Sequence, residues 1–137
     1  MRFLACCSVL LLSACNSPTG RGPEVIPWLQ GSWEYTATQT DPSLRMSGTL
    51  TIGQQAGDSI SGSIEYTEVD AQGNSRTRVN LFTGRVRSAR DITIDAYVGS
   101  RIRTHSGMLA GDSIAGSFEQ QVNENLSYNG SFFARRQ

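Results

Sequence analysis

The chain is informative first in what it lacks. Its 137 residues include no lysine, so its twelve basic side chains are all arginine, and twelve acidic ones balance them to zero net charge. A neutral chain has no overall field to attract nucleic acid, and we expect no nucleic-acid partner. Histidine occurs once, at His105. Because one histidine without cysteine or acidic neighbours cannot form the usual zinc site, we expect neither a metal nor another cofactor.

Cysteine is scarce too, and its three positions all precede residue 16. Within residues 1–14, the basic residue Arg2 is followed by an apolar stretch from Phe3 to Leu12. This stretch is too short to span a bilayer as a helix, which needs about 20 apolar residues. The run ends in Leu12-Ser13-Ala14-Cys15, which is similar to a lipobox, the signal of bacterial lipoproteins. The resemblance implies that 1–14 is a signal peptide and that Cys15 receives diacylglycerol and acyl chains such as palmitate. An ordinary signal peptide, the alternative, would leave Cys15 as an unpaired thiol in an oxidising compartment.

Residues 15–24 are predicted to be the lipidated N-terminus and a flexible tether, because their Pro, Gly and Ser content gives them no means to pack. We therefore expect a cell-envelope protein attached to a membrane through Cys15. Asn16 is not the aspartate associated with retention in the inner membrane. The resemblance to lipoproteins accordingly favours the outer membrane if the host is diderm.

From residue 25 the pattern is that of a single β domain, 25–137. Apolar and polar residues alternate with period two, no window has a helical period, and turn signals such as Gly57-Asp58 and Gly111-Asp112 separate the alternating runs. The sequence predicts an all-β fold, a small antiparallel up-and-down β-barrel of about eight strands. The predicted strands are 31–38, 45–54, 59–67, 77–87, 91–98, 101–110, 113–122 and 126–135.

Glycine indicates which side of each strand faces inward. A Gly-x-apolar step occurs seven times, as in Gly62/Ile64 and Gly107/Leu109, and lets a strand coil while a large side chain fills the interior. An eight-stranded barrel is either filled by its own side chains or holds one small ligand, and the sequence leaves both open. The candidates for a ligand-facing interior are Trp33, Tyr35, Leu50, Ile64, Ile94, Phe118 and Phe132.

The first predicted strand opens with Gly31-Ser32-Trp33 after the segment 25–30. This start is similar to that of the calycin group of lipocalins, fatty-acid-binding proteins and avidins. The resemblance implies a short turn of helix that caps the barrel floor, and a structural pair in which Trp33 packs against Arg136 of the last strand. Trp28 is the only other tryptophan, so the further tryptophans of an avidin biotin site are missing.

The remaining polar residues suggest no chemistry. His105 is opposite in phase to Ile102, so we expect it to face solvent. The arginines of the basic band, 76–103, are expected outward and solvated, although such a band also suits anionic lipid or polysaccharide. No Gly-x-Ser-x-Gly elbow and no glycine-rich phosphate loop occurs, and we expect no enzyme.

Two functions remain open at this stage. In the first, the anchored barrel binds a small apolar or amphipathic ligand. In the alternative, a filled barrel is an interaction module for an envelope protein or polysaccharide, or a protease inhibitor. Fold alone does not choose between them.

Overall fold

The structure is a computed structural model that describes residues 25–137. The predictions for the signal peptide 1–14, for lipidation at Cys15 and for the tether 15–24 lie outside the described residues.

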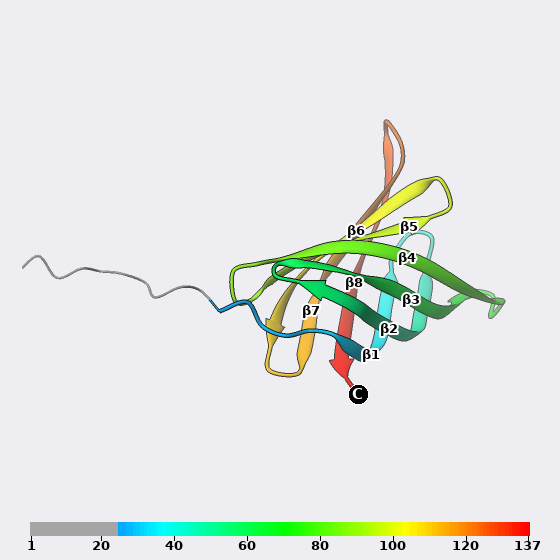
Figure 1. Ribbon diagram of the computed structural model, residues 1–137. Helices are drawn as coiled ribbons and strands as arrows, with labels where there is room; N and C mark the ends of the chain where they lie inside the picture. Colours follow the sequence, from blue (N-terminus) through cyan, green and yellow to red (C-terminus); the bar gives the residue numbers. More distant parts are fainter. Residues whose placement is uncertain (1–24) are drawn as a thin grey trace, which may run out of the picture.

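Eight antiparallel strands form a closed barrel (Figure 1). Each strand pairs with the next along the chain, and β1 closes the barrel by pairing with β8. The predicted all-β up-and-down barrel is therefore confirmed, and the architecture is consistent with a calycin-like barrel. The strands are β1 Gly31–Gln39, β2 Leu44–Ala56, β3 Ser59–Asp70, β4 Ser75–Arg87, β5 Asp91–Val98, β6 Arg101–Ala110, β7 Ser113–Asn123 and β8 Leu126–Arg136.

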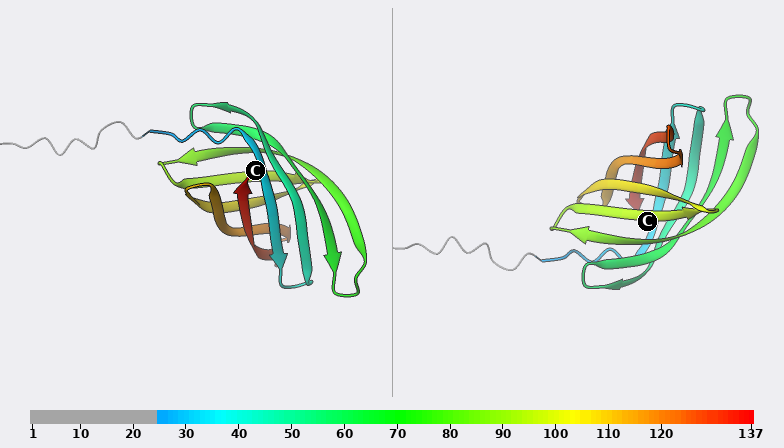
Figure 2. Two further views of the ribbon diagram at one scale, coloured as in Figure 1. Left: turned by 90° about the horizontal axis from the view of Figure 1, so that it is seen from below. Right: turned by 90° about the horizontal axis from the view of Figure 1, so that it is seen from above.

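The barrel has two distinct ends. We call one end the floor; it carries the turns 57–58, 88–90 and 111–112 and the segment 25–30. The opposite end, the mouth, carries the four remaining turns, including the β3–β4 and β7–β8 turns. Figures 1 and 2 show the described N-terminal segment beside the floor turns, away from the long β3–β4 hairpin. The chain therefore enters the barrel at the floor.

The floor is closed by a stack of side chains. The Arg136 guanidinium lies 4.5 Å from the centroid of the Trp33 ring, and the indole N–H donates to the Leu29 carbonyl at 3.0 Å. Trp33 and Leu29 are completely buried. A cation over an indole contributes about 0.5–2 kcal/mol, so the contact reinforces barrel closure where β8 meets β1.

The helical turn expected over the floor is absent: residues 25–30 form neither helix nor strand. Side chains from the barrel satisfy this segment instead. Gln55 accepts from the Leu29 N–H at 2.7 Å and donates to the Pro27 carbonyl at 2.8 Å. Arg136 donates to the carbonyls of Trp28, at 2.8 Å, and Gln30, at 3.2 Å. Because these groups replace helical hydrogen bonds, the segment caps the floor in an extended form.

Glycine steps on β2, β3, β7 and β8 place backbones in close contact. A Cβ atom on Gly62 would collide with the carbonyl oxygen of Thr51 on the neighbouring strand. The floor half of the barrel is then filled by aliphatic side chains on the inward phase. Its fully buried members include Leu50, Ile52, Ile92 and Ile114.

The described residues contain no helix of the length and apolarity that a bilayer crossing needs.

Candidate binding site at the barrel mouth

Strand β6 turns a basic pair into the barrel. Arg103 and His105 are 4% and 1% exposed, whereas Ile102 is 49% exposed. The prediction that His105 faces solvent is therefore wrong, and so is the outward placement of Arg103 within the basic band. The physical reason is that Ile102 packs on the outer surface opposite Tyr97, which reverses the phase assumed for the strand.

The Gly-x-apolar step Gly107/Leu109 indicated correctly which face of β6 points into the barrel. Both residues have the same parity as Arg103 and His105 along the strand. A Cβ on Gly107 would meet the ring of Phe132 inside the barrel. Since residues two apart share a face, the glycine step was the signal that would have placed His105 inward.

His105 and Tyr35 form a neutral layer across the interior. The Tyr35 hydroxyl lies 3.0 Å from His105 Nε2, and the His105 ring packs edge-on against Phe132 at 5.0 Å. Burial, with a smaller contribution from the Arg103 charge, lowers the pKa of His105 to about 4. Burial raises the pKa of the Tyr35 hydroxyl well above its usual value. Both side chains are thus uncharged at neutral pH.

Above this layer lies the Arg103 guanidinium. Its Nε donates to the Gln120 side-chain carbonyl at 3.0 Å, and Nη1 lies 3.3 Å from both the Tyr66 hydroxyl and the Met46 sulfur. The guanidinium carbon, Cζ, is 5.0 Å from the centroid of the Phe118 ring. Among residues 25–137, no carboxylate lies within ion-pair distance of Arg103. This cation is therefore buried with neutral partners alone.

The tyrosine beside Arg103 has a defined hydrogen-bond direction. The side-chain amide of Asn80 is best oriented with its oxygen toward the Tyr66 hydroxyl, at 2.9 Å. Its nitrogen then donates to the backbone carbonyls of Tyr97 and Val79, each at 3.3 Å. In that orientation Tyr66 donates to Asn80 and accepts from Arg103. In this orientation Asn80 and Tyr66 both have partners, and the tyrosine holds the guanidinium in place without neutralising its charge.

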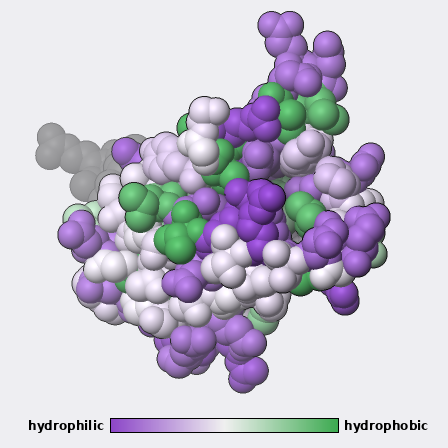
Figure 3. Space-filling view, turned by 90° about the vertical axis from the view of Figure 1, so that its right-hand side faces the viewer, coloured by the Kyte–Doolittle hydropathy of each residue, from purple (hydrophilic) through white to green (hydrophobic). Residues whose placement is uncertain are grey.

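A pocket of about 310 Å³ opens directly above the guanidinium. Figure 3 views the mouth end and shows hydrophilic residues in the middle of the face with hydrophobic ones around them. The only acidic lining residue, Glu68, is paired with Arg78 at 2.7 Å. The residues that line the pocket are Gln39, Leu44, Glu68, Arg78, Val98, Gly99, Arg101, Arg103, Gln120 and Tyr128.

Gln39, which lines this pocket, also contains a buried acceptor without a partner. Its amide nitrogen donates to the Pro42 carbonyl at 2.9 Å, while its buried Oε1 has no hydrogen-bond partner. An unpaired buried oxygen costs about 1–3 kcal/mol. The pocket is therefore lined by a cation without a counter-charge, Arg103, and by a glutamine whose side-chain oxygen is buried without a partner.

The residues singled out from the sequence divide between core and floor. All seven candidates for the ligand-facing interior are buried, but none lines the mouth pocket. The pair Trp33–Arg136 is in contact at the opposite end. Arg103 and Gln120 were missed because strand phase and cross-strand register decide their position. Within residues 25–137, no three His, Cys, Asp or Glu side chains gather as a metal-binding group.

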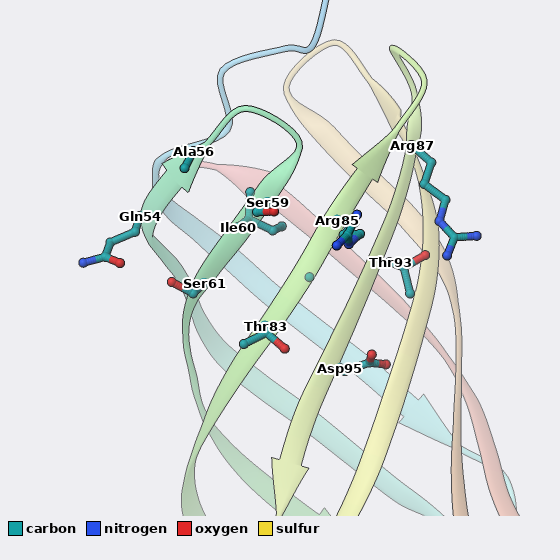
Figure 4. Close-up of a pocket in the computed structure, with 11 residues that line it drawn as sticks. Gln54, Ala56, Ser59, Ile60, Ser61, Thr83, Arg85, Arg87, Thr93 and Asp95 are labelled. Atoms are coloured by element: carbon teal, nitrogen blue, oxygen red, sulfur yellow. The ribbon is translucent and has the colours of Figure 1, made fainter.

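A second hollow, of about 560 Å³, lies on the outer face of β2–β5. Figure 4 shows its lining residues spread along these strands, with Gln54 pointing away from the others. Its two arginines, Arg85 and Arg87, are exposed, and Arg85 lies 3.5 Å from the Asp58 carboxylate. Because its charges are solvated and no polar group is buried and unpaired there, the mouth pocket is the stronger candidate.

No family model matches the sequence, and no curated protein matches it. Two solved structures have a similar fold: EF1p2_mFAP2b bound to DFHBI, with 15% identity and a TM-score of 0.64, and a de novo designed fluorescence-activating β-barrel, with 19% identity and a TM-score of 0.53. Each comparison covers 80% of this chain and 94% of the other. At these identities the likeness establishes the fold alone.

Proposed function

We propose that this protein is a membrane-anchored envelope lipoprotein whose barrel binds a small amphipathic anion at its mouth. The observation that carries the proposal is Arg103, a guanidinium that is 4% exposed, has no carboxylate partner and lies at the base of a pocket. An unpaired buried cation costs several kcal/mol in the empty protein. A bound anion offsets that cost, because it supplies the missing counter-charge.

The charge of the pocket favours the same ligand class. Arg78 is neutralised by Glu68, which leaves Arg101 at the rim and Arg103 at the base. Arginine recognises carboxylate, phosphate and sulfonate groups through paired N–H donors. The head of the ligand is therefore anionic.

The size of the pocket limits the apolar part of the ligand. Ligand pockets span roughly 300–1,000 Å³, so about 310 Å³ is at the lower end. Leu44, Val98 and Tyr128 supply apolar surface at the rim. Below Arg103, the Tyr35–His105 layer and the buried apolar side chains of the core cluster occupy the interior. A short apolar group at the mouth fits this site better than a long chain.

Two further observations support the proposal as a whole. The sequence Leu12-Ser13-Ala14-Cys15 supports lipid anchoring and an envelope location, with the outer membrane favoured in a diderm host. A barrel of the same fold is described as bound to DFHBI, a small molecule, so the architecture is compatible with a ligand site.

A second candidate function rests on the outer surface. Val79, Leu81, Tyr97 and Ile102 are 46–67% exposed and lie on the outward faces of β4, β5 and β6. Tyr97 and Ile102 are direct cross-strand partners. A contiguous apolar strip on a barrel wall is typical of a protein-contact surface. This favours the alternative of an interaction module for another envelope protein.

Two matched fluorescent probes test the primary proposal. Anilinonaphthalene sulfonate carries a sulfonate, and N-phenylnaphthylamine is a close neutral analogue. We expect saturable binding of the anionic probe, with weaker binding at high salt, and preference for it over the neutral one. Native mass spectrometry of protein taken gently from its host should also reveal a co-purifying acidic molecule. Equal affinity for both probes would contradict the anion site.

A further inference from the structure

Trp28 is unusual for a tryptophan because its side chain is 64% exposed. Its backbone is nevertheless fixed to the barrel: the Trp28 carbonyl accepts from Arg136 at 2.8 Å, and the preceding Pro27 carbonyl accepts from Gln55 at 2.8 Å. The structure thus holds a large amphipathic ring outward at the floor. Val25, in the same segment, is 80% exposed. Tryptophan in such a position is typical of a membrane–water interface.

Positive charges outnumber negative ones around this ring. The floor end carries five arginines and four acidic residues, namely Arg85, Arg87, Arg90, Arg135 and Arg136 with Glu34, Asp58, Asp91 and Asp112. Two of these aspartates pair with arginine, Asp58 with Arg85 at 3.5 Å and Asp112 with Arg136 at 3.6 Å.

The floor is left with a positive excess. Arg87, Arg90 and Arg135 are exposed and make no ion pair within the described residues. The floor acids outside those pairs are Asp91 and Glu34, the cross-strand partners of Arg87 and Arg135, so the excess at the floor is one positive charge. Clusters of exposed arginines at a membrane-proximal surface attract anionic lipid headgroups.

We infer that the floor of the barrel docks on an anionic phospholipid surface, with Trp28 in the interface and Arg87 and Arg90 over the headgroups. This inference rests on the proposed anchoring at Cys15, and not on the proposed ligand. Cys15 precedes Val25 by ten residues, which reach at most about 35 Å even when fully extended. The described chain enters the barrel at the floor (Figure 1), so this reach is measured from the floor end.

Docking of the floor sets the direction of the binding site. The mouth pocket lies at the opposite end of the barrel, so it opens away from the bilayer and exchanges its ligand with the aqueous phase. A protein docked by the mouth would instead take its ligand from the lipid. The location of Trp28 therefore distinguishes a carrier that samples solution from one that samples the membrane.

Brominated phospholipid in reconstituted vesicles tests the orientation. The full chain, purified from host membranes, is placed in vesicles of phosphatidylethanolamine and phosphatidylglycerol that contain a lipid brominated near the headgroup. Trp33 is completely buried, so Trp28→Phe gives the background from Trp33 alone. We expect bromolipid quenching in the parent protein and its loss in Trp28→Phe.

The arginines are tested by charge removal at the two ends. In Arg87→Gln/Arg90→Gln, the ratio of quenched to unquenched protein, measured by fluorescence lifetimes, should fall about 25-fold, or about fivefold for each arginine. Arg45→Gln/Arg76→Gln makes the same charge change at the mouth and should leave the ratio unchanged.

The possible failures are distinguishable. Protein that floats with the vesicles but is quenched only by aqueous acrylamide is anchored with its floor undocked, and this overturns the inference while anchoring stands. Protein that does not float overturns both. Neither result bears on probe binding at Arg103.

Discussion

Replacing Arg103 by methionine should separate binding from folding. Methionine keeps much of the length and apolar contact of arginine but removes its charge. If the guanidinium is the counter-charge for an anionic ligand, its removal should cost about 2 kcal/mol of binding free energy, the lower end of the range for a buried charged partner, because the pocket is open to solvent. The dissociation constant of the anionic probe should therefore rise about 30-fold.

The expected effect of Arg103→Met on stability is small. The variant loses charged hydrogen bonds to Gln120 and Tyr66, each worth about 1.5–3 kcal/mol. It also relieves the desolvation of an unpaired cation, which costs several kcal/mol in the folded state. The two effects oppose each other, and we expect the free energy of unfolding to stay within about 2 kcal/mol of the parent value.

Three measurements follow this variant. Urea denaturation gives its stability, fluorescence titration gives its probe affinity, and NMR of the single histidine gives the pKa of His105. The pKa of His105 should rise without Arg103, yet stay below its usual value because burial is the larger cause of its depression. Arg85→Met, which removes an exposed outer-face charge, is the control. A large loss of stability with unchanged probe affinity would make Arg103 a structural residue and refute the reasoning.

Three further predictions concern the fold. Trp33→Ala should lower the free energy of unfolding by about 3–5 kcal/mol in urea denaturation, and a variant as stable as the parent would remove Trp33 from the core role. Stability should fall by about 3 kcal/mol as pH drops from 6.5 to 4, because the unfolded chain takes up a proton that buried His105 does not; His105→Gln should lack this component. Gly62→Ala should cost about 1–3 kcal/mol by collision with Thr51. Gly53→Ala, whose Cβ would only touch the Ser61 carbonyl oxygen at 4.0 Å, should change stability by less than about 0.5 kcal/mol in the same assay.

The fold was predictable because its determinants are local. Period-two alternation and glycine-containing turns recur along the chain, and each is readable within a few residues. Gly57 and Gly111, for example, occupy the left-handed region with φ of 60° and 59°, as the turn signals require. Once eight such strands follow each other with short turns, sequential antiparallel pairing and closure leave few alternatives.

The candidate site at the mouth was not predictable in the same way because its residues are distant in sequence. Arg103 meets Gln120, Tyr66 and Met46, which are 17, 37 and 57 residues away and come from three other strands. Their meeting depends on the phase of β6 and on the register of several strand pairs at once. A single error of phase, caused by the exposed Ile102, moved the charged group from the interior to the surface.

The missing helical turn at the floor has a related cause. The sequence of residues 25–30 gives no sign that Gln55 and Arg136 bind its backbone, since these side chains come from β2 and from the end of β8. A local pattern cannot reveal a hydrogen-bond partner that lies 26 or more residues away. The Trp33–Arg136 contact, by contrast, was accessible through the family resemblance, which supplies that distant information.

The division of the barrel explains how it tolerates a buried charge at all. Trp33, Leu50 and Ile114 are fully buried in the floor half of the barrel, and the buried side chains around them are apolar. The neutral Tyr35–His105 pair separates this core from Arg103. Polar groups at the mouth therefore raise the energy of the folded state locally without opening the floor. Substitutions above the Tyr35–His105 layer should change ligand affinity much more than stability, whereas substitutions below it should do the reverse.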